Sequence, residues 1–302
     1  MTELLAIVGP TAVGKSSLAL DLAQRLDGEI VNLDAFQIYR GMDIGTAKPT
    51  AAEQRLVRHH VIDVVDLDYD ASVVEFQAWA RGAIDDIRSR GRLPIAVGGS
   101  GLYVRAILDE LEVPPTNPEV RAKYERWLDE LGGAALHAKL AAVDPQAANE
   151  ILPGNTRRVV RALEVIELTG QSFTATLPDP APRYHDIRVG LDLPREALRA
   201  RVEQRVHAML ANGWLEEVAR LRELGLFETR TACKAIGYLE VDRLHRGEIT
   251  QDAAVAEITD ITMRFVKRQL QWFRRDRRVT WLGSTRPDLA DEVCQLVERS
   301  SR

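Results

Sequence analysis

The stretch Leu4-Leu-Ala-Ile-Val-Gly9-Pro-Thr-Ala-Val-Gly14-Lys15-Ser16 decides the fold, and a helical pattern over residues 17–23 follows it. Apolar strand, glycine-containing loop and helix are the order that a phosphate-binding P-loop requires. Gly9 and Gly14 permit a tight turn, so that consecutive backbone N–H groups converge on phosphate oxygens. Lys15 adds a positive charge, the Ser16 hydroxyl suits Mg²⁺, and the helix N-terminus favours the same anion. Because every fixed position and both flanks are present, we interpret the motif as a di- or triphosphate site rather than a chance glycine-rich turn.

The chain beyond this motif predicts an α/β fold. Apolar runs at 29–33, 61–65, 93–97 and 187–193 are typical of buried strands, and helical patterns such as 17–26 and 73–89 lie between them. This alternation indicates a parallel sheet covered on both faces, with ligands beyond the carboxyl ends of the strands. We therefore predict a parallel-sheet core of the P-loop NTPase type. Its P-loop, Asp34 and the loop Gly98-Gly-Ser-Gly101 follow three strands and should share one edge.

Two proline-rich breaks delimit a segment of another kind. Pro114-Pro-Thr-Asn-Pro118 ends the first part, and Pro178-Asp-Pro-Ala-Pro182 precedes the return to a strand. Between them the pattern is helical, with no strand-like run. We predict an α/β core formed by 1–112 and 184–302, with an all-helical insertion domain at 113–183.

Composition limits the class of protein. The chain has 302 residues, of which 45% are hydrophobic, so it can bury one large core or two smaller ones. Two cysteines, Cys233 and Cys294, make no disulfide scaffold, and neither has metal-ligand spacing around it. No apolar run approaches the ~20 residues that cross a bilayer, and the N-terminus lacks the basic region of a signal peptide. We expect a cytoplasmic protein.

Basic residues are segregated although the net charge is −5. Residues 264–278 hold seven lysines and arginines against the single Asp276, with Trp272 and Phe273 among them. Such a run is either a solvated helix face or a nucleic-acid surface. Arg157, Arg158 and Arg161 pose a similar choice, because their spacing places at least two of them on one helix face. They fit a solvated surface, a lid that closes over phosphate, or contacts to a nucleic-acid backbone.

Two further residues could carry chemistry. Asp34 ends the run 29–34, where its carboxylate suits a general base or a Mg²⁺ ligand, or else caps the next segment. Arg205 falls within the apolar stripe of the predicted helix 196–210, which includes Val202 and Val206. A guanidinium there needs an anion, either an internal carboxylate or, better in a P-loop protein, a ligand phosphate. The simplest inference is an ATP-binding kinase of a small metabolite, but no apolar strand ends in a typical Walker B carboxylate unless Asp34 or Asp66 serves.

Longer motifs carry a specific resemblance. The P-loop and Asp34-Ala-Phe-Gln-Ile-Tyr-Arg-Gly-Met-Asp-Ile-Gly-Thr-Ala-Lys-Pro49 resemble the tRNA dimethylallyltransferases. So do Val97-Gly-Gly-Ser-Gly-Leu-Tyr103, Arg161-Ala-Leu-Glu-Val165, Ala235-Ile-Gly-Tyr238 and Lys267-Arg-Gln-Leu-Gln-Trp-Phe273. The similarity runs from the first strand to about Leu282, and the block from Tyr39 to Pro49 is typical of this family. It is far more specific than the P-loop alone.

The resemblance implies an enzyme whose P-loop holds a diphosphate rather than ATP. The donor would be dimethylallyl diphosphate, and the acceptor the exocyclic amine of adenine at tRNA position 37, next to the anticodon. Asp34 matches the family's general base and Arg205 its diphosphate-side arginine, so that Asp34, Ser16 and Arg205 form the expected catalytic set. The cofactor is Mg²⁺ on Ser16. The residues expected to bind diphosphate are Gly9, Pro10, Thr11, Ala12, Val13, Gly14, Lys15 and Ser16.

The same resemblance implies a monomer that binds the tRNA anticodon stem-loop, partly through the insertion, and flips the target base into a pocket. Ser100 stands where threonine is common, and Lys234 lies where relatives vary. The residues expected to contact tRNA are Asp34, Ala35, Phe36, Gln37, Ser100, Arg121, Arg157, Arg158, Arg161, Lys234, Gly237 and Tyr238. The rival functions are a small-molecule kinase, which the block after Asp34 disfavours, and a non-catalytic RNA-binding module, which intact Lys15, Ser16 and Asp34 disfavour.

Overall fold

The computed structural model describes residues 3–173 and 181–300. It divides into two compact units: unit 1 comprises 1–110 and 182–302, and unit 2 comprises 111–181. The dividing points lie two residues from the predicted boundaries at 112/113 and 183/184. None of the helices in the described ranges is long and apolar enough to cross a membrane.

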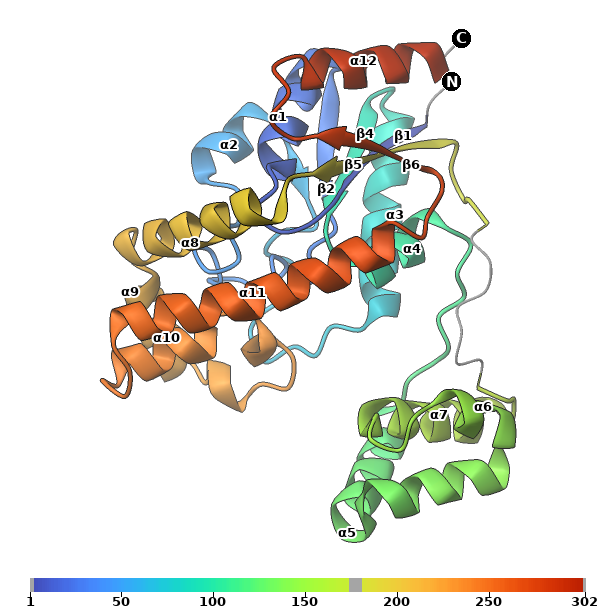
Figure 1. Ribbon diagram of the computed structural model, residues 1–302. Helices are drawn as coiled ribbons and strands as arrows, with labels where there is room; N and C mark the ends of the chain where they lie inside the picture. Colours follow the sequence, from blue (N-terminus) through green and yellow to red (C-terminus); the bar gives the residue numbers. More distant parts are fainter. Residues whose placement is uncertain (1–2, 174–180, 301–302) are drawn as a thin grey trace. The chain divides into compact units, whose positions relative to one another are not determined.

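Unit 1 is built on one parallel sheet, as the sequence predicted (Figure 1). Its strand order is β3-β2-β4-β1-β5-β6, so the strand that carries the P-loop is central. All five residues of β1 are buried, which is typical of a strand covered on both faces. The strands are β1 (Leu4–Val8), β2 (Gly28–Asn32), β3 (His59–His60), β4 (Leu93–Gly98), β5 (Asp186–Asp192) and β6 (Val279–Gly283).

Alternate residues of β1 enter two different cores. Leu4, Ala6 and Val8 pack with residues of α3 (Val73–Ser89) and α4 (Gly101–Leu108). Leu5 and Ile7 pack with α1 (Lys15–Arg25) and α12 (Leu289–Ser300), which Figure 1 shows on the opposite side of the sheet. The period of two in a strand produces these two layers. The remaining helices of unit 1 are α2 (Ala51–Leu56), α8 (Arg195–Ala211), α9 (Trp214–Glu223), α10 (Tyr238–His245) and α11 (Gln251–Phe273), with single 3₁₀ turns at Leu226–Glu228 and Ala232–Lys234.

One predicted strand was wrong. Residues 61–65 do not form a strand, and the edge strand β3 lies just before them at His59–His60. Val61 and Asp63 have φ values of 62° and 53°, which no strand accommodates, and a left-handed valine is rare. The Val61 carbonyl instead accepts a hydrogen bond of 2.9 Å from Asn32 Nδ2. Strand β6 was missed, because it follows directly after the arginine-rich run.

The described part of unit 2 is helical. It consists of α5 (Pro118–Val143), α6 (Pro145–Glu150) and α7 (Thr156–Thr169), and Gly132 interrupts α5 with a φ of 79°. Residues from all three helices, including Tyr124, Leu136, Ala147 and Leu163, form its own apolar core. The second proline-rich break falls mostly on residues 174–180, outside the described residues.

Candidate active site

The P-loop connects the end of β1 to the start of α1, and its two glycines are required by the backbone. Gly9 has a φ of 138°, and a Cβ atom there would lie 2.8 Å from the carbonyl oxygen of Leu191 in the neighbouring strand. Gly14 has a φ of 106° immediately before the first helical residue, Lys15. Both backbone conformations favour glycine, so the loop geometry follows from the sequence. Four hydrogen-bond donors at the start of α1 are left for a ligand.

Lys15 stands inside the site with a perturbed charge. Its Nζ donates a hydrogen bond of 2.7 Å to the carbonyl oxygen of Pro10. Burial, and secondarily the Arg205 cation, lower the pKa of Lys15 to about 7, while Asp34 acts in the opposite direction. Loss of hydration disfavours the ammonium form. An anionic ligand would restore it, because opposite charges nearby favour the charged form.

Asp34 is held at the end of β2 by its neighbours. Its backbone N–H donates to Asn32 Oδ1 at 2.8 Å, and Asn32 Nδ2 donates to the Asp34 carbonyl at 3.0 Å. The Asp34 carboxylate accepts from the backbone N–H of Phe36 at 2.9 Å. Burial raises the pKa of Asp34; the Phe36 N–H, Lys15 and Arg205 oppose that rise. A carboxylate with a raised pKa is a stronger base, which suits proton abstraction.

Arg205 lies in α8 among buried apolar side chains, as its phase in the sequence predicted. Leu198, Val202 and Val206 are at most 4% exposed. Arg205 itself is half-buried, and its guanidinium makes no hydrogen bond or ion pair with any residue that the structure describes. Burial lowers the pKa of its guanidinium, and Asp34 is the negative group that opposes this. An unpaired guanidinium beside a P-loop is suited to phosphate oxygens.

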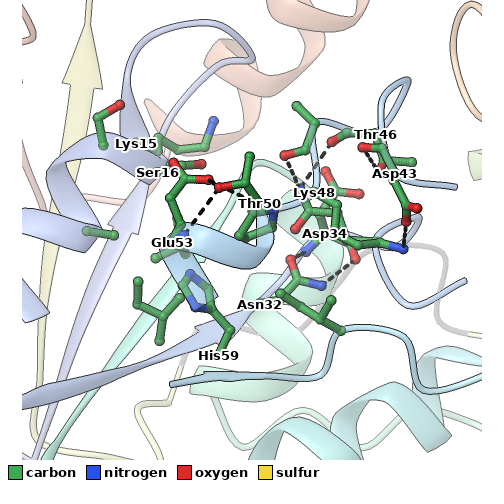
Figure 2. A pocket seen from close by; sticks show the side chains of 18 of the residues that line it. Lys15, Ser16, Asn32, Asp34, Asp43, Thr46, Lys48, Thr50, Glu53 and His59 are labelled. Atoms are coloured by element: carbon green, nitrogen blue, oxygen red, sulfur yellow. Dashed lines mark hydrogen bonds and ion pairs between the residues drawn. The ribbon is translucent and has the colours of Figure 1, made fainter. Parts of the chain in front are cut away.

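Asp34 and Arg205 stand where two cavities meet. The first, of about 970 Å³, is lined by the P-loop residues Lys15 and Ser16 and by the segment 43–54. Figure 2 shows Lys15 and Ser16 on the other side of this cavity from Asp43, Thr46 and Lys48. The second, of about 240 Å³, has aromatic and aliphatic side chains as well as Lys234 and Arg268 in its walls. The residues that line both cavities are Thr11, Asp34, Thr46, Arg205 and Met209.

The segment 43–51 lines the first cavity, and its residues Gly45 and Thr46 also line the second. A residue that the sequence analysis missed holds this segment in place. Glu217 of α9, 5% exposed, accepts hydrogen bonds from the backbone N–H groups of Asp43, Ile44 and Gly45 at 2.7–3.1 Å. It also accepts one from the Tyr238 hydroxyl at 2.8 Å. Three consecutive N–H groups converging on one carboxylate fix the loop. The residue looks like an ordinary surface glutamate in the sequence of α9, so no local signal identified it.

Trp214 explains two glycines of the motifs. A Cβ atom at Gly45 would lie 2.3 Å from Trp214 Nε1, and one at Gly237 would lie 2.3 Å from another atom of the same ring. Trp214 is 1% exposed and packs edge-on against Tyr238. The ring therefore brings two loops together that are far apart in the sequence. Lys48 also holds the segment 43–51 in place. Its Nζ donates hydrogen bonds of 2.5–2.8 Å to the Tyr39 carbonyl oxygen and to the carboxylates of Asp43 and Asp63.

Of the residues in unit 1 that were predicted to contact tRNA, most line or lie beside the two cavities, whereas Gly237 and Tyr238 are buried. Asp34, Phe36, Ser100 and Lys234 line the second cavity, and Gln37 lines the first, where its Nε2 donates to the Thr46 and Ala47 carbonyls. Ala35 lies between them and is half-buried. Tyr238 is different. Its side chain is fully buried and hydrogen-bonded to Glu217, whereas most of the other side chains predicted to contact tRNA in unit 1 border a cavity; the tRNA contact of Tyr238 stays a prediction. Gly237 is buried beside it, against Trp214.

In unit 2 the predicted arginines also divide. Glu164, fully buried, accepts hydrogen bonds from Arg121, Arg161, the Thr116 hydroxyl and the Asn117 N–H at 2.6–3.1 Å. These bonds lower the pKa of Glu164 against the effect of burial. Arg121 and Arg161 are therefore committed to an internal carboxylate. In contrast, Arg157 and Arg158 are exposed, and their side chains have no hydrogen bond or ion pair within the described ranges.

The first cavity has the donor set for a bound Mg²⁺ that keeps its own waters. The Ser16 hydroxyl lines it and has no hydrogen-bond partner among the described residues, and Asp34 is on the same cavity. No group of three or more histidine, cysteine or acidic side chains in the described ranges could form a complete metal cage. Magnesium commonly needs only one or two protein ligands when a substrate phosphate supplies others. The residues present fit such an ion.

Comparison with known protein families matched two models. The model described as IPP transferase matches residues 37–276, and the one described as isopentenyl transferase matches residues 2–68. A protein named tRNA dimethylallyltransferase from Salinispora tropica is 51% identical over 298 residues, which cover 99% of this chain and 93% of that protein. A protein of the same name from Thermobifida fusca is also 51% identical, over 98% of this chain and 95% of its own length.

Two solved structures extend the similarity to the fold. A tRNA isopentenylpyrophosphate transferase from Bacillus halodurans has a TM-score of 0.72 and 39% identity, covering 100% of this chain and 98% of that one. A eukaryotic dimethylallyltransferase, described as acting on tRNA, has a TM-score of 0.80 and 26% identity, covering 99% of this chain and 78% of that one. Both similarities include the insertion as well as the P-loop core.

Proposed function

Because the chain belongs to the IPP transferase family, we propose that it transfers the dimethylallyl group of dimethylallyl diphosphate to the exocyclic amine of adenine at tRNA position 37, releasing diphosphate. One observation carries this proposal beyond the family name. Asp34 and Arg205 line both of two cavities, one with the P-loop and one with the aromatic side chains of Phe36, Trp214 and Phe265 in its walls. A reaction between a diphosphate donor and a planar base needs such a junction.

Asp34 acts as the general base. The amine of adenine is a weak nucleophile, because its lone pair is delocalised into the ring. In the reaction the nitrogen forms a bond to the allylic carbon, the carbon–oxygen bond to diphosphate breaks, and the amine proton passes to the Asp34 carboxylate. The raised pKa of Asp34 supports this role, since it makes the carboxylate more basic than an exposed aspartate.

The leaving group is stabilised by cations around the P-loop. Breaking an allylic carbon–oxygen bond places negative charge on diphosphate, and fixed positive groups lower the energy of that charge. Lys15, Arg205 and the N–H groups that begin α1 supply them. Mg²⁺ held by Ser16 would add a Lewis acid at the same oxygens. Arg205 supports this assignment because it has no protein partner in the described part of the chain.

The tRNA is bound through its anticodon stem-loop. The base is stacked in that loop and must be extruded into a pocket before it can react. The second cavity supports this step, because Phe36 and Phe265 are in its walls and Lys234 and Arg268 bring positive charge to it. Exposed Arg157 and Arg158 of unit 2 supply phosphate contacts. We further propose that the protein acts as a monomer on tRNA in the cytoplasm.

The test is an incubation of the protein with unmodified tRNA, Mg²⁺ and dimethylallyl diphosphate, followed by mass analysis of the digested nucleosides. We expect an adenosine that carries one dimethylallyl group, at position 37, and its loss in Lys15→Ala. ATP in place of the donor should give no product. Transfer of phosphate from ATP to a small acceptor, with no prenylated adenosine, would instead establish the kinase function.

A further inference from the structure

One buried amide of helix α11 contacts both loops of the donor site. Gln269 is 4% exposed, although Lys267, Arg268 and Gln271 around it in the sequence are exposed. Its Oε1 accepts a hydrogen bond from the Thr11 backbone N–H at 3.0 Å. Its Nε2 donates to the Gly99 carbonyl oxygen, also at 3.0 Å. A flipped amide would oppose donor to donor and acceptor to acceptor, so both bonds together fix one orientation.

Each bond fixes a peptide unit next to a residue of the site. The Thr11 N–H shares its peptide plane with the Pro10 carbonyl, which accepts the hydrogen bond from Lys15 Nζ at 2.7 Å. In a trans peptide these two groups point in opposite directions. Gln269 therefore holds the plane from one side, and Lys15 binds it on the other. The Gly99 carbonyl likewise belongs to the peptide unit that leads into Ser100.

Ser100 is flanked by Gly99 and Gly101, and helix α11 lies close to the backbone at both glycines. A Cβ atom at Gly99 would lie 2.3 Å from Gln269 Nε2 and 3.1 Å from the Gly9 carbonyl oxygen. At Gly101 a Cβ atom would lie 2.1 Å from Trp272, which is three residues after Gln269 and on the same side of α11. The two glycines that flank Ser100 thus permit the close approach. Helix α11, the P-loop and the Ser100 loop form one hydrogen-bonded assembly.

We propose that Gln269 is a positioning residue for the donor: it sets the 10–11 peptide that holds Lys15, while its bond to the Gly99 carbonyl fixes its own amide, and it so links the basic helix α11 to diphosphate binding. The proposal rests on the proposed function for the identity of the donor. The role of Gln269 can be tested without prenyl transfer, because Gln269 determines where Lys15 lies when an anion enters the first cavity. The Thr11 N–H donates to Gln269 and is therefore not available to phosphate. The N–H groups that bind phosphate are those that come after Thr11 in the P-loop.

The experiment compares Gln269→Met, which keeps the length of the side chain and removes both hydrogen bonds, with Gln251→Met. Gln251 is exposed at the start of the same helix and is the matched control. Calorimetry at 25 °C measures the affinity for inorganic diphosphate, which needs no tRNA and no turnover. A filter-binding assay measures the affinity for unmodified tRNA. A wild-type protein that fails to bind diphosphate would overturn the proposed function rather than the role of Gln269.

We expect Gln269→Met to weaken diphosphate binding and to raise the donor KM by up to about 10²-fold, the scale of the loss that a misplacement by about 1 Å causes. The tRNA affinity should stay within about twofold, and Gln251→Met should match the wild type. If Gln269→Met does not fold, Gly99→Ala, which displaces the same amide, must give the same selective loss. Unchanged diphosphate affinity despite a lower Tm, or equal loss of diphosphate and tRNA affinity, overturns the proposal.

Discussion

The perturbed charge of Lys15 makes donor binding depend on pH in a direction that the structure defines. Burial, and then the Arg205 cation, lower the pKa of Lys15 to about 7. The ammonium form therefore falls from about 90% at pH 6 to about 10% at pH 8 in the free protein. A bound diphosphate requires the ammonium form, so binding at pH 8 should take up about 0.9 proton, and donor affinity should fall roughly tenfold per pH unit above 7.

The sign for folding is the opposite of that for binding. Between pH 7 and the ordinary lysine value of 10.5, the unfolded chain holds the Lys15 proton and the folded chain does not. Stability therefore rises with pH across this window relative to Lys15→Met, in which nothing titrates at this position. Donor affinity falls across the same window, because the ligand must bring the proton back. The two opposite slopes distinguish this lysine from a general effect of pH on the protein.

Calorimetry without Mg²⁺ provides the measurement. Dimethylallyl diphosphate is titrated at pH 8 in two buffers of different ionisation enthalpy, and the difference in heat gives the number of protons taken up. Lys15→Arg is the control, since a guanidinium stays charged at every pH used. Arg205→Met should take up fewer protons than the wild type, because it removes the second cause of the lowered pKa. Uptake below about 0.2 proton by the wild type at pH 8, or constant donor affinity from pH 7 to 9, would refute the reasoning.

Three further outcomes are expected. Asp34→Asn should lower kcat by about 10²-fold or more, the usual effect of losing a general base, with tRNA affinity retained in a binding assay; wild-type turnover would exclude Asp34 as the base. Glu217→Gln leaves one N–H of the 43–45 loop facing an amide donor, so Tm should fall by about 5–10 °C in a calorimetric scan, and an unchanged Tm would contradict the role of this carboxylate. Replacing both Arg157 and Arg158 by Gln should weaken tRNA binding and reduce its salt slope by about 0.7–0.9 per lost phosphate contact, whereas an unchanged slope would leave both as solvated surface.

The sequence by itself determined the parts of the protein that depend on local pattern. The P-loop followed from Gly9, Gly14 and Lys15, because only glycine tolerates these backbone angles and contacts. The covering of both faces of the sheet followed from the alternation of apolar strands and helical patterns along the chain. The phase of Arg205 in its helix placed a cation among apolar side chains, and the structure has buried Leu198, Val202 and Val206 around it. That Asp34 is the negative group that acts on it came from the fold. For the P-loop and for the phase of Arg205 the cause lies within about one turn or one strand of the residue.

The tertiary structure decided what depends on residues distant in the sequence. Gln269 lies in a basic run that reads as surface, but folding buries it against Thr11, 258 positions away. Glu217 reads as a solvated helix residue until its carboxylate meets the N–H groups of Asp43 to Gly45. Buried polar groups must find partners, and which partner they find depends on how the elements pack. For that reason the sequence could identify the residues of the chemistry, while only the fold identified those that hold them in place.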